Sequence, residues 1–387
     1  MVGRRSPLTD VTEEDALLAL RILPGVGDLG VIRLLLRWGS ARAAWSEVGS
    51  LSEGARPETR KALADPSGLL DRARAIAAHC RRDGFRITGF LDPQYPRELH
   101  HLYDPPPVLF SFGDFELLNR PLVAMVGSRK ATATGRRTAE RLAAELSAGG
   151  MGVVSGMALG IDGAAHKGAL TGPGGTVAVL ARGPDRAYPV ANAGLFRAVA
   201  RQGLLVSEFP PGEKARSFHF PRRNRIIAAL AWGVVVVEAG RRSGVLITVD
   251  HALDLGREVM AVPGSVEWEQ TRGTHELIKR LGCIVTTSDE ILETVPWAAL
   301  ELESLPAELV ESARRVASSV ATISAPPVEE RLGDIVGIEP MPLEAILRRS
   351  GLPASRTLAA LTRLEVEGRL RREPEGWVRV SSGRGSS

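Results

Sequence analysis

The chain has 387 residues, which is long for a single hydrophobic core and indicates two or three domains. Hydrophobic residues make up 44% and charged residues 24%, which is typical of a globular protein and excludes a disordered or membrane-embedded chain. The formal net charge is only +4, so a site for an anionic polymer requires local clusters of basic residues.

Two cysteines, Cys80 and Cys283, lie far apart and outside any CxxC pair, which argues against a disulfide framework or a cysteine metal site. We expect both to be buried thiols in a reducing cytosol. Residues 1–10 lack the apolar core of a signal peptide, and no apolar run is long enough to span a membrane. We therefore expect a cytoplasmic protein with no membrane partner.

Residues 1–82 are predicted to form a small helical domain, because apolar residues recur at helical spacing over Leu17–Ile22 and Val31–Leu35. The intervening segment Leu23–Gly27 has the composition of a turn. It is either a phosphate-binding turn of the helix-hairpin-helix kind, with a SAM-like domain around it, or a plain turn with glycine caps. Few basic residues surround it.

Residues 83–295 alternate short apolar runs with helical stretches, which predicts a doubly wound, Rossmann-like α/β domain with a parallel sheet covered on both faces. The expected strands are Leu122–Val126, Gly152–Ser155, Thr176–Ala181, Leu204–Ser207, Val234–Glu238, Val259–Val262 and Ile284–Thr286. Ligands of such folds bind beyond the carboxyl ends of the strands, so the residues that follow each strand are the candidates for function.

Residues 296–330 are predicted to be a linker with one helix over Pro306–Val320, because they are rich in Glu, Ala, Ser and Pro. Residues 331–380 follow the plan of a winged helix, and residues 381–387 form a disordered tail. The winged-helix elements are a helix Leu343–Arg349, a second helix Ala354–Gly368 and a hairpin Leu370–Val380 that turns at Glu373–Gly376.

A glycine junction follows the first predicted strand. Gly127, Ser128, Arg129 and Lys130 separate this strand from a predicted helix over Thr132–Ala148. Such a junction directs free backbone amides and the positive end of a helix toward an anion. It lacks the GxGxxG spacing of a dinucleotide site, and a turn with an exposed arginine is the alternative interpretation.

The most unusual segment is Phe220–Ile227, in which Pro221 suits the first position of a helix. Arg222, Arg223 and Arg225 then fall, with Asn224, in the first turn, where the helix dipole disfavours each exposed cation by about 0.3–1 kcal/mol. An anionic partner would remove this conflict, and the planar guanidinium suits phosphate. An exposed basic turn is the alternative.

Two further junctions join this set: Ser155 and Gly156 after the second strand, and Arg242, Ser243 and Gly244 before a later helix. Several such junctions along one sheet edge predict a groove for a polymer with regularly spaced phosphates rather than a nucleotide pocket. Aromatic residues that could stack on bases are few near these loops. They are Tyr188, Phe209, Phe218 and Phe220.

Glu208 and Glu238 end two strands, but no histidine, cysteine or metal-ligand cluster accompanies them. We expect them to accept hydrogen bonds from the arginine segment or nearby loops, and His166 to be a packed or helix-surface residue. We therefore predict no catalytic residue, no metal site and no cofactor.

Several segments, in order, resemble the DNA-processing protein A (Smf) family over roughly Phe90–Thr294. They are Tyr95-Pro96, Leu99 and Pro105–Phe110, then Val126–Arg129, Ser155–His166, Phe220–Ala228, Ser243–Thr248, Gly256-Arg257 and Ala261–Gly264. Ala181-Arg182-Gly183 departs from the Gly-x-Gly usual in the family. Val190 and Ala193 stand where lysines are frequent, and a basic contact on this rim would have to come from Arg182, Arg186 or Arg197.

The resemblance implies a dimeric, non-enzymatic protein that binds single-stranded DNA, protects incoming DNA during natural transformation and loads a RecA-type recombinase. It also implies that Arg129 and the Arg223-Asn224-Arg225 segment contact the phosphate backbone. Ser128, Ser155, Gly156 and Ser243 would then offer hydroxyls or a close backbone approach.

Two other functions compete with this interpretation. A Rossmann-like nucleotide phosphoribohydrolase carries a PGGxGT loop after a strand, whereas Pro173–Thr176 precedes one here. A winged-helix regulator needs a basic recognition helix, whereas Arg356 and Arg363 are accompanied by Glu365 and Glu367.

The segment Thr271–Gly282 is predicted to be a helix with an apolar stripe that includes Leu277 and Ile278. The stripe either covers the sheet or, as the resemblance implies, pairs two subunits. A two-fold interface would bring His275 close to its own counterpart.

Overall fold

The computed structural model describes residues 11–49, 56–295 and, in the C-terminal part, 332, 335–337, 340–350, 357, 361, 364–365, 369–373 and 376–379. The chain divides into two compact units. The first comprises Met1–Ile278 with Ile284–Val316, and the second comprises Lys279–Cys283 with Ala317–Ser387. The expected linker helix Pro306–Val320 and the tail 381–387 lie outside the described residues.

The first unit begins with a helical region, as predicted. Its helices are α1 (Glu13–Ile22), α2 (Gly27–Trp38), α3 (Ala41–Glu47), α4 (Pro57–Leu63) and α5 (Pro66–Asp83). Thr12 and Asp15 form a capping box that starts α1, which satisfies backbone amides that would otherwise lack partners. The turn between α1 and α2 needs glycine, because Gly25 and Gly27 both have positive φ angles. Its role in binding DNA stays a prediction.

An eight-stranded sheet follows, in the order β1-β2-β6-β5-β4-β3-β7-β8. The strands are β1 (Arg86–Gly89), β2 (Val108–Gly113), β3 (Leu122–Val126), β4 (Gly152–Ser155), β5 (Thr176–Val179), β6 (Leu204–Ser207), β7 (Gly233–Val236) and β8 (Glu258–Ala261). Strands β3 to β8 pair in parallel, as predicted for the core. Every residue of β3, β4, β5, β6 and β7 is buried, which explains their continuous apolar sequences.

The predicted parallel sheet is confirmed for β3 to β8, and one edge of the sheet is antiparallel. β2 pairs antiparallel with both β1 and β6, so the sheet is mixed. An antiparallel edge on a parallel sheet is common, and it arises here because β1 and β2 form a hairpin-like pair before the doubly wound part begins. The expected strand Ile284–Thr286 is reduced to one bridge between Ala261 and Ile284.

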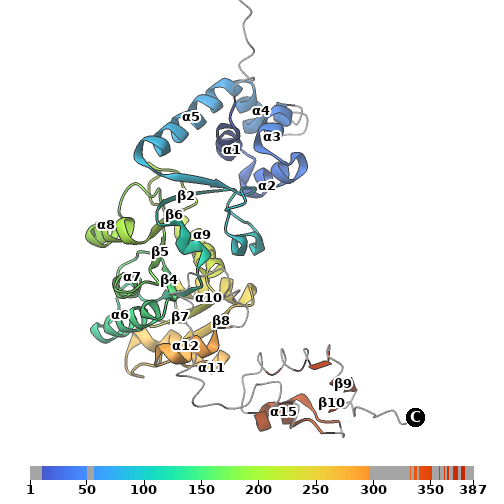
Figure 1. The fold of residues 1–387 in the computed structure, drawn as a ribbon, viewed down its shortest axis with the longest axis vertical. Coiled ribbons are helices and arrows are strands. Elements are labelled where there is room, and N and C mark those ends of the chain that lie inside the picture. Colours follow the sequence, from blue (N-terminus) through green and yellow to red (C-terminus); the bar gives the residue numbers. More distant parts are fainter. Residues whose placement is uncertain are drawn as a thin grey trace, which may run out of the picture. The chain divides into compact units, whose positions relative to one another are not determined.

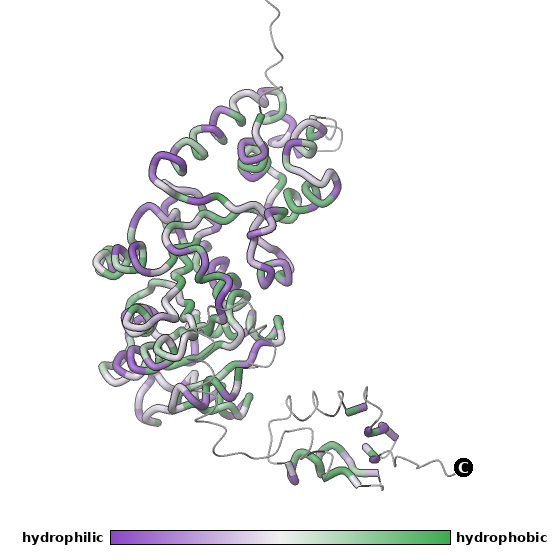
Figure 2. The backbone as a smooth tube through the Cα atoms, in the orientation of Figure 1, coloured by the Kyte–Doolittle hydropathy of each residue, from purple (hydrophilic) through white to green (hydrophobic). Residues whose placement is uncertain are grey.

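Helices cover both faces of the sheet (Figure 1). They are α6 (Ala133–Ala148), α7 (Ile161–Ala169) and α8 (Ala193–Gln202) on one face, and α9 (His219–Leu230) and α10 (Val245–Asp254) on the other. The hydrophobic residues concentrate on the strands between these layers (Figure 2). After β6 the chain crosses to the other side of β3 to form β7, so the winding direction reverses between β3 and β7. This reversal opens a crevice beyond the carboxyl ends of the two strands.

The second unit has a winged-helix core of its own. Helix α15 (Leu343–Ser350) and the antiparallel strands β9 (Leu370–Glu373) and β10 (Gly376–Arg379) agree with the predicted helix and hairpin. Trp377 and Met341 exchange backbone hydrogen bonds, which holds the hairpin against the segment before α15. The apolar cluster consists of Leu332, Val336, Ile346, Leu361, Leu364, Leu370 and Trp377. No helix among the described residues is long and apolar enough to cross a membrane.

Helices α6 and α7 approach each other closely at Gly168. A side chain at this position would collide with the backbone carbonyl of Glu140. We expect Gly168→Ala to lower the free energy of unfolding by about 1–3 kcal/mol, because the backbones must move apart to admit a methyl group. Thermal or urea unfolding measures the change.

The matched control is Gly194→Ala in α8, where an added Cβ meets nothing within 4 Å. This substitution is expected to be neutral or stabilising by up to about 1 kcal/mol, since alanine favours helix more than glycine does. Equal stability of the Gly168→Ala variant and the wild type would show that the two helices tolerate a wider separation.

Candidate nucleic-acid interface

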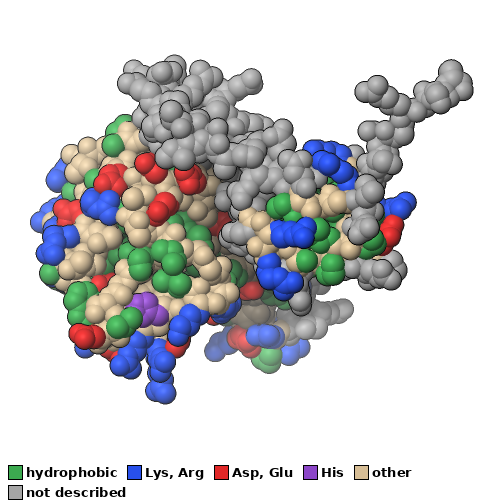
Figure 3. All heavy atoms as spheres, turned by 90° about the horizontal axis from the view of Figure 1, so that it is seen from below, with side chains coloured by type: hydrophobic (Ala, Val, Ile, Leu, Met, Phe, Trp, Pro, Cys, Tyr) green, Lys and Arg blue, Asp and Glu red, His purple; other side chains and the backbone are tan. Residues whose placement is uncertain are grey.

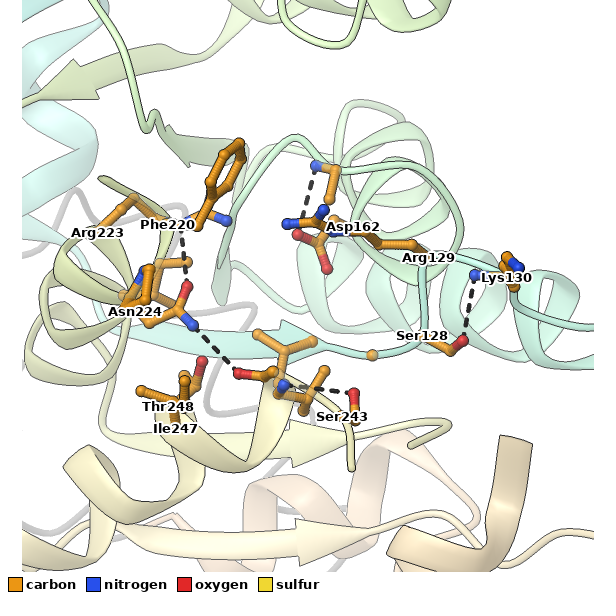
Figure 4. Close-up of a pocket in the computed structure, with 17 residues that line it drawn as sticks. Ser128, Arg129, Lys130, Asp162, Phe220, Arg223, Asn224, Ser243, Ile247 and Thr248 are labelled. Carbon is orange, nitrogen blue, oxygen red and sulfur yellow. Dashed lines mark hydrogen bonds between the residues drawn. The ribbon is translucent and has the colours of Figure 1, made fainter. Parts of the chain in front are cut away.

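A hollow of about 450 Å³ lies at the point where the winding direction of the sheet reverses. The loop after β3, the first half of α9 and the start of α10 form its walls (Figure 4). Of the predicted site residues, it brings together Gly127, Ser128, Arg129, Lys130, Arg223, Asn224, Ser243 and Gly244. Three separate sequence motifs therefore meet at one place, at the edge of the sheet where ligands of this fold class bind.

Arg129 and Lys130 are the exposed cations of this hollow. Neither has a carboxylate within ion-pairing distance among the described residues. The guanidinium of Arg129 lies over the ring of Phe220, 4.8 Å from its centroid, and this cation–π contact holds the side chain against the wall. Tyr188, with its ring 5.8 Å from that of Phe220, extends the aromatic surface and is 45% exposed. Cationic and aromatic surfaces are therefore adjacent.

Two side chains fix the opposite wall. Asn224 Nδ2 donates to the Gly244 carbonyl at 3.3 Å, which ties α9 to the start of α10. The Ser243 hydroxyl accepts from the Val245 amide at 3.3 Å, and the Ser128 hydroxyl accepts from the Lys130 amide at 3.1 Å. Each hydroxyl keeps its own proton to donate, so each can still hydrogen-bond a phosphate oxygen.

Arg223 has a different environment from Arg129, because only 5% of it is exposed. Its Nη1 donates to the carbonyls of Gly156 and Val179, at 2.8 Å for the latter, and so bridges the ends of β4 and β5. The guanidinium lies directly on the Cα of Gly156, where any side chain would overlap it. Burial lowers the pKa of Arg223 to about 10, against the opposing effect of Asp162, so the group stays charged at neutral pH.

The loop after β4 is held by side chains of α7. Asp162 accepts from the amides of Gly156 and Ala158, and His166 Nε2 accepts from the amide of Met157 at 3.2 Å. Met157 has a φ of 58°, which is unusual for a residue with a side chain and needs such support. These three consecutive amides are therefore bonded inside the protein and are not directed at a ligand.

His166 is fully buried, and its Nδ1 lies 2.7 Å from the Thr176 hydroxyl. Thr176 donates its own proton to the Val153 carbonyl, so Nδ1 of His166 must carry the proton and Nε2 must accept. Burial, with a smaller contribution from Arg223, lowers the pKa of His166 to about 3. The expectation of a packed histidine is confirmed, and its function is to hold the Met157 turn.

The predicted helix start at Pro221 was wrong. α9 begins at His219, so Arg222, Arg223 and Arg225 follow the first turn and conflict less with the helix dipole. Arg222 pairs with Asp28 of α2 and, at 2.7 Å, with Glu208. Arg225 is almost completely buried and pairs with Glu208 at 2.7 Å and with Asp104 at 3.3 Å. Neither of these two arginines lines the hollow.

Other predicted residues also lie outside the hollow. Ser155 is buried and donates to the Met125 carbonyl at 2.6 Å, while Arg242 is exposed on the loop before α10 but is not part of the lining. Gly156 borders a smaller hollow of about 150 Å³ beside Tyr188. The two glutamates act as expected, since Glu208 binds the arginine segment and Glu238 accepts from the Thr132 amide and hydroxyl.

Glu238 also changes how the junction after β3 works. Together with the Thr132 hydroxyl, which accepts from the Gly135 amide, it satisfies the start of α6 from within the protein. Two of the amides expected to be free at this helix end, those of Thr132 and Gly135, are therefore occupied, and Arg129 and Lys130 supply the positive charge of the junction. The sequence could have indicated this, because Thr132 is a strong N-cap residue.

Helix α11 (Arg272–Leu281) and helix α12 (Ser288–Thr294) lie at the far end of the sheet. Figure 3 looks onto this end and shows hydrophobic side chains near the middle of the face, with Lys and Arg along its edge. Leu277 is 4% exposed, whereas His275 and Ile278 are half-buried. His275 Nε2 lies 3.0 Å from the Gly264 carbonyl.

Within the described residues, no group of three or more His, Cys, Asp or Glu side chains is arranged to hold a metal ion. Asp162, the one acid in the lining of the hollow, is buried and bonded to backbone amides, and burial raises its pKa against the opposing effect of Arg223. The interface therefore offers cations, hydroxyls, an amide and aromatic rings, which together suit the phosphates and bases of a nucleic acid.

The fold and the hollow define a doubly wound α/β protein with a basic crevice at its switch point and an additional winged helix. Residues 86–296 match the model of the family described as DNA recombination-mediator protein A, and residues 316–376 match the DprA winged helix domain. The chain belongs to the DNA processing protein A (DprA/Smf) family.

Relatives cover most of the chain. It is 36% identical over 267 residues to DNA processing protein DprA of Bacillus subtilis, covering 68% of this chain and 90% of that protein. It is 38% identical over 287 residues to protein Smf of Escherichia coli, covering 74% and 75%. The X-ray structure of DNA processing protein A from Streptococcus pneumoniae superposes with a TM-score of 0.58 at 35% identity, covering 74% and 95%.

A structure from Helicobacter pylori, described as revealing a single-stranded DNA binding mode of DNA processing protein A, superposes with a TM-score of 0.50 at 28% identity. The superposition covers 54% of this chain and 94% of the Helicobacter pylori chain.

The buried His166 gives a pH dependence of stability with a definite sign. Its pKa of about 3 in the folded chain lies below the value of about 6.5 expected in the unfolded chain, so the unfolded state binds the extra proton. The stability that the neutral ring provides is present above pH 6.5 and is lost as the pH falls toward 3. Between these two pH values, this residue changes the free energy of unfolding by up to about 1.4 kcal/mol per pH unit.

Urea unfolding between neutral pH and pH 4 measures this slope. His166→Gln is expected to be less stable at neutral pH and to lose part of the pH dependence, whereas a control that replaces the exposed His101 keeps it. Parallel pH profiles for the wild type and His166→Gln would contradict the assignment of a neutral, buried ring.

Proposed function

We propose that this chain binds single-stranded DNA across the hollow at the switch point and acts as a recombination mediator rather than as an enzyme. The observation that carries this proposal is the position of Arg129. An exposed cation with no carboxylate within ion-pairing distance among the described residues lies against the Phe220 ring, at the ligand-binding edge of the sheet. Phosphate contacts supply most of the affinity for a nucleic acid, and ring faces accept bases of any sequence.

The residues of the motif Arg222–Arg225 have different contacts, and we therefore assign them different roles. Arg223 and Asn224 line the hollow, so we assign them to its wall, with Arg223 holding the loops and Asn224 holding α10. Gly127, Ser128, Lys130, Ser243 and Gly244 complete the DNA-contacting set. Arg222 and Arg225 act indirectly, because their charges are neutralised by Glu208 and its neighbours.

A nucleotide phosphoribohydrolase fits these observations less well. The segment Pro173–Thr176 ends at the first residue of β5 and so lies at the amino end of the strand, away from the ligand-binding edge. Glu208 and Glu238 are bonded to Arg222, Arg225 and Thr132, and neither lines the hollow. The acid that does line it, Asp162, accepts from backbone amides. Incubation with nucleoside monophosphates tests this alternative, and release of free base would favour it.

The wider role follows from family membership. We infer that the chain is a cytoplasmic homodimer that protects single-stranded DNA and passes it to a RecA-type recombinase, as in natural transformation. The half-buried side of α11 around His275 and Ile278 is the proposed dimer surface, with Leu277 supporting it from beneath. The winged helix is then an additional module, and a sequence-specific regulator is the less favoured role for it.

Arg129→Ala is expected to weaken binding of single-stranded DNA. The slope of the logarithm of the binding constant against the logarithm of the salt concentration should become about 0.7 less steep, for one lost phosphate contact. Fluorescence anisotropy with labelled oligothymidylate at several salt concentrations measures both. The control is Arg72→Ala on α5, which removes an exposed arginine outside the hollow. Unchanged affinity and slope in Arg129→Ala would remove the basis for placing DNA in this hollow.

If the chain is a recombination mediator, it should increase the rate at which a RecA-type recombinase assembles on DNA coated with single-strand-binding protein. Recombinase ATP hydrolysis, followed with and without this chain, gives that rate. Arg129→Ala should require more protein for the same rate, since it binds DNA less tightly. An unaltered rate with saturating wild-type protein would leave DNA binding intact and exclude the loading role.

A further inference from the structure

A second basic hollow lies on the other side of Arg129. Its volume is about 760 Å³, larger than that of the hollow at the switch point. We call it the α6–α7 groove, because α6 and α7 form its two long walls and residues 191–195 close one end. The lining residues are Arg129, Ala133, Arg136, Arg137, Glu140, Leu159, Gly160, Gly163, Ala164, Lys167, Ala191, Asn192, Gly194 and Leu195.

The spacing of these residues shows that two helix faces build the groove. Residues 133, 136, 137 and 140 of α6 and residues 160, 163, 164 and 167 at α7 both follow the pattern i, i+3, i+4, i+7. Residues at this spacing lie on one face of a helix. Contact at Gly168 sets the separation of the two helices, so the groove belongs to the rigid packing of the core.

The charges of the groove are unbalanced. Arg136, Arg137 and Lys167 are exposed, and like Arg129 they have no ion-pair partner among the residues that the structure describes. Arg136 donates to the Ala131 carbonyl at 2.6 Å and Arg137 to the Thr134 hydroxyl at 3.2 Å, and both acceptors are neutral. Arg141, on the same helix but outside the groove, is paired with Glu145 at 3.0 Å.

Small residues form the floor of the groove and leave it open. Alanine and glycine occupy positions 133, 160, 163, 164, 191 and 194, which leaves room for a close approach of a sugar–phosphate chain. Leu159 is 42% exposed and lines both this groove and the small hollow beside Tyr188. Asn192 fixes the rim by donating to the carbonyls of Met157 and Ala158 at 2.9 and 3.0 Å. Glu140 is the one acid in the lining.

We propose that a single DNA strand held in the hollow at the switch point continues past Arg129 into the α6–α7 groove. There Arg136, Arg137 and Lys167 contact its phosphates. Arg129 lines both hollows, which makes their basic linings continuous. This proposal rests on the proposed function and lengthens the bound segment, so its effect depends on the length of the oligonucleotide.

The experiment compares a short oligothymidylate of about four nucleotides with a long one of about sixteen. The double variant Arg137→Glu/Lys167→Glu is expected to bind the long strand at least tenfold more weakly at low salt. Its salt slope should fall by about 1.4, from two lost phosphate contacts. Binding of the short strand should change less than twofold, because the hollow at the switch point is intact.

The matched control, Arg72→Glu/Arg201→Glu, makes the same change in net charge on exposed residues of α5 and α8 outside the groove. It should bind both strands nearly as the wild type does, and thermal unfolding should show that both double variants are folded. Unchanged binding of the long strand by Arg137→Glu/Lys167→Glu overturns the proposal, as does an equal loss of affinity for both lengths.

The two proposals fail in different ways. If the wild type binds the short strand and Arg129→Ala does not, the proposed function stands whatever the groove variant does. If the wild type binds neither strand, both proposals are wrong.

Discussion

The buried guanidinium of Arg223 is the contact on which the rest of the interface depends. It comes from α9 on one face of the sheet and bonds the carbonyls at the ends of β4 and β5. A buried charge is tolerated only where hydrogen bonds replace its hydration, and here these carbonyls and Asn224 provide them. The position of α9, and of Phe220 one turn earlier, follows from this contact. Gly156 must remain glycine, because the guanidinium occupies the place of its side chain.

The arginines of α9 around this contact have two different structural roles. Arg222 and Arg225 neutralise Glu208, and Arg222 also pairs with Asp28, which attaches α2 of the helical region to the core. Arg223 holds the strand ends. A cluster that looks in sequence like one anion-binding motif is therefore mostly structural, and it rigidifies the surface on which the exposed Arg129 and Lys130 act. A rigid surface binds a flexible strand at a lower entropic cost than a mobile one would.

The positions of Arg129 and of the loop after β4 also bear on specificity. Asp162 and His166 bind the three amides that follow β4, so this loop presents a shaped wall rather than a phosphate cradle. A nucleotide-binding Rossmann protein uses such amides to hold a pyrophosphate. With these amides occupied and cations placed along two hollows instead, the fold suits an extended chain of phosphates better than one nucleotide.

The sequence by itself determined the fold class and the order of the motifs. Apolar runs such as Leu122–Val126 and Leu204–Ser207 are recognisable because strands buried on both faces need continuous apolar residues. The winged-helix hairpin was predictable for a similar local reason, since its turn between Glu373 and Gly376 is short. The edge strand β1 was missed, because Arg86–Gly89 is only partly buried and carries no such pattern.

Tertiary structure decided which charged residues are available to a ligand. Arg223 and Arg225 are as basic in sequence as Arg129, and only their partners across the fold show that they are buried. Likewise, Arg137 and Lys167 lie thirty positions apart and became neighbours through the packing of α6 on α7. Local patterns encode secondary structure, whereas the exposure and pairing of a charge depend on contacts between residues distant in sequence. The sequence therefore identified the motifs, and only the folded chain separated the arginines that support the interface from those that can meet DNA.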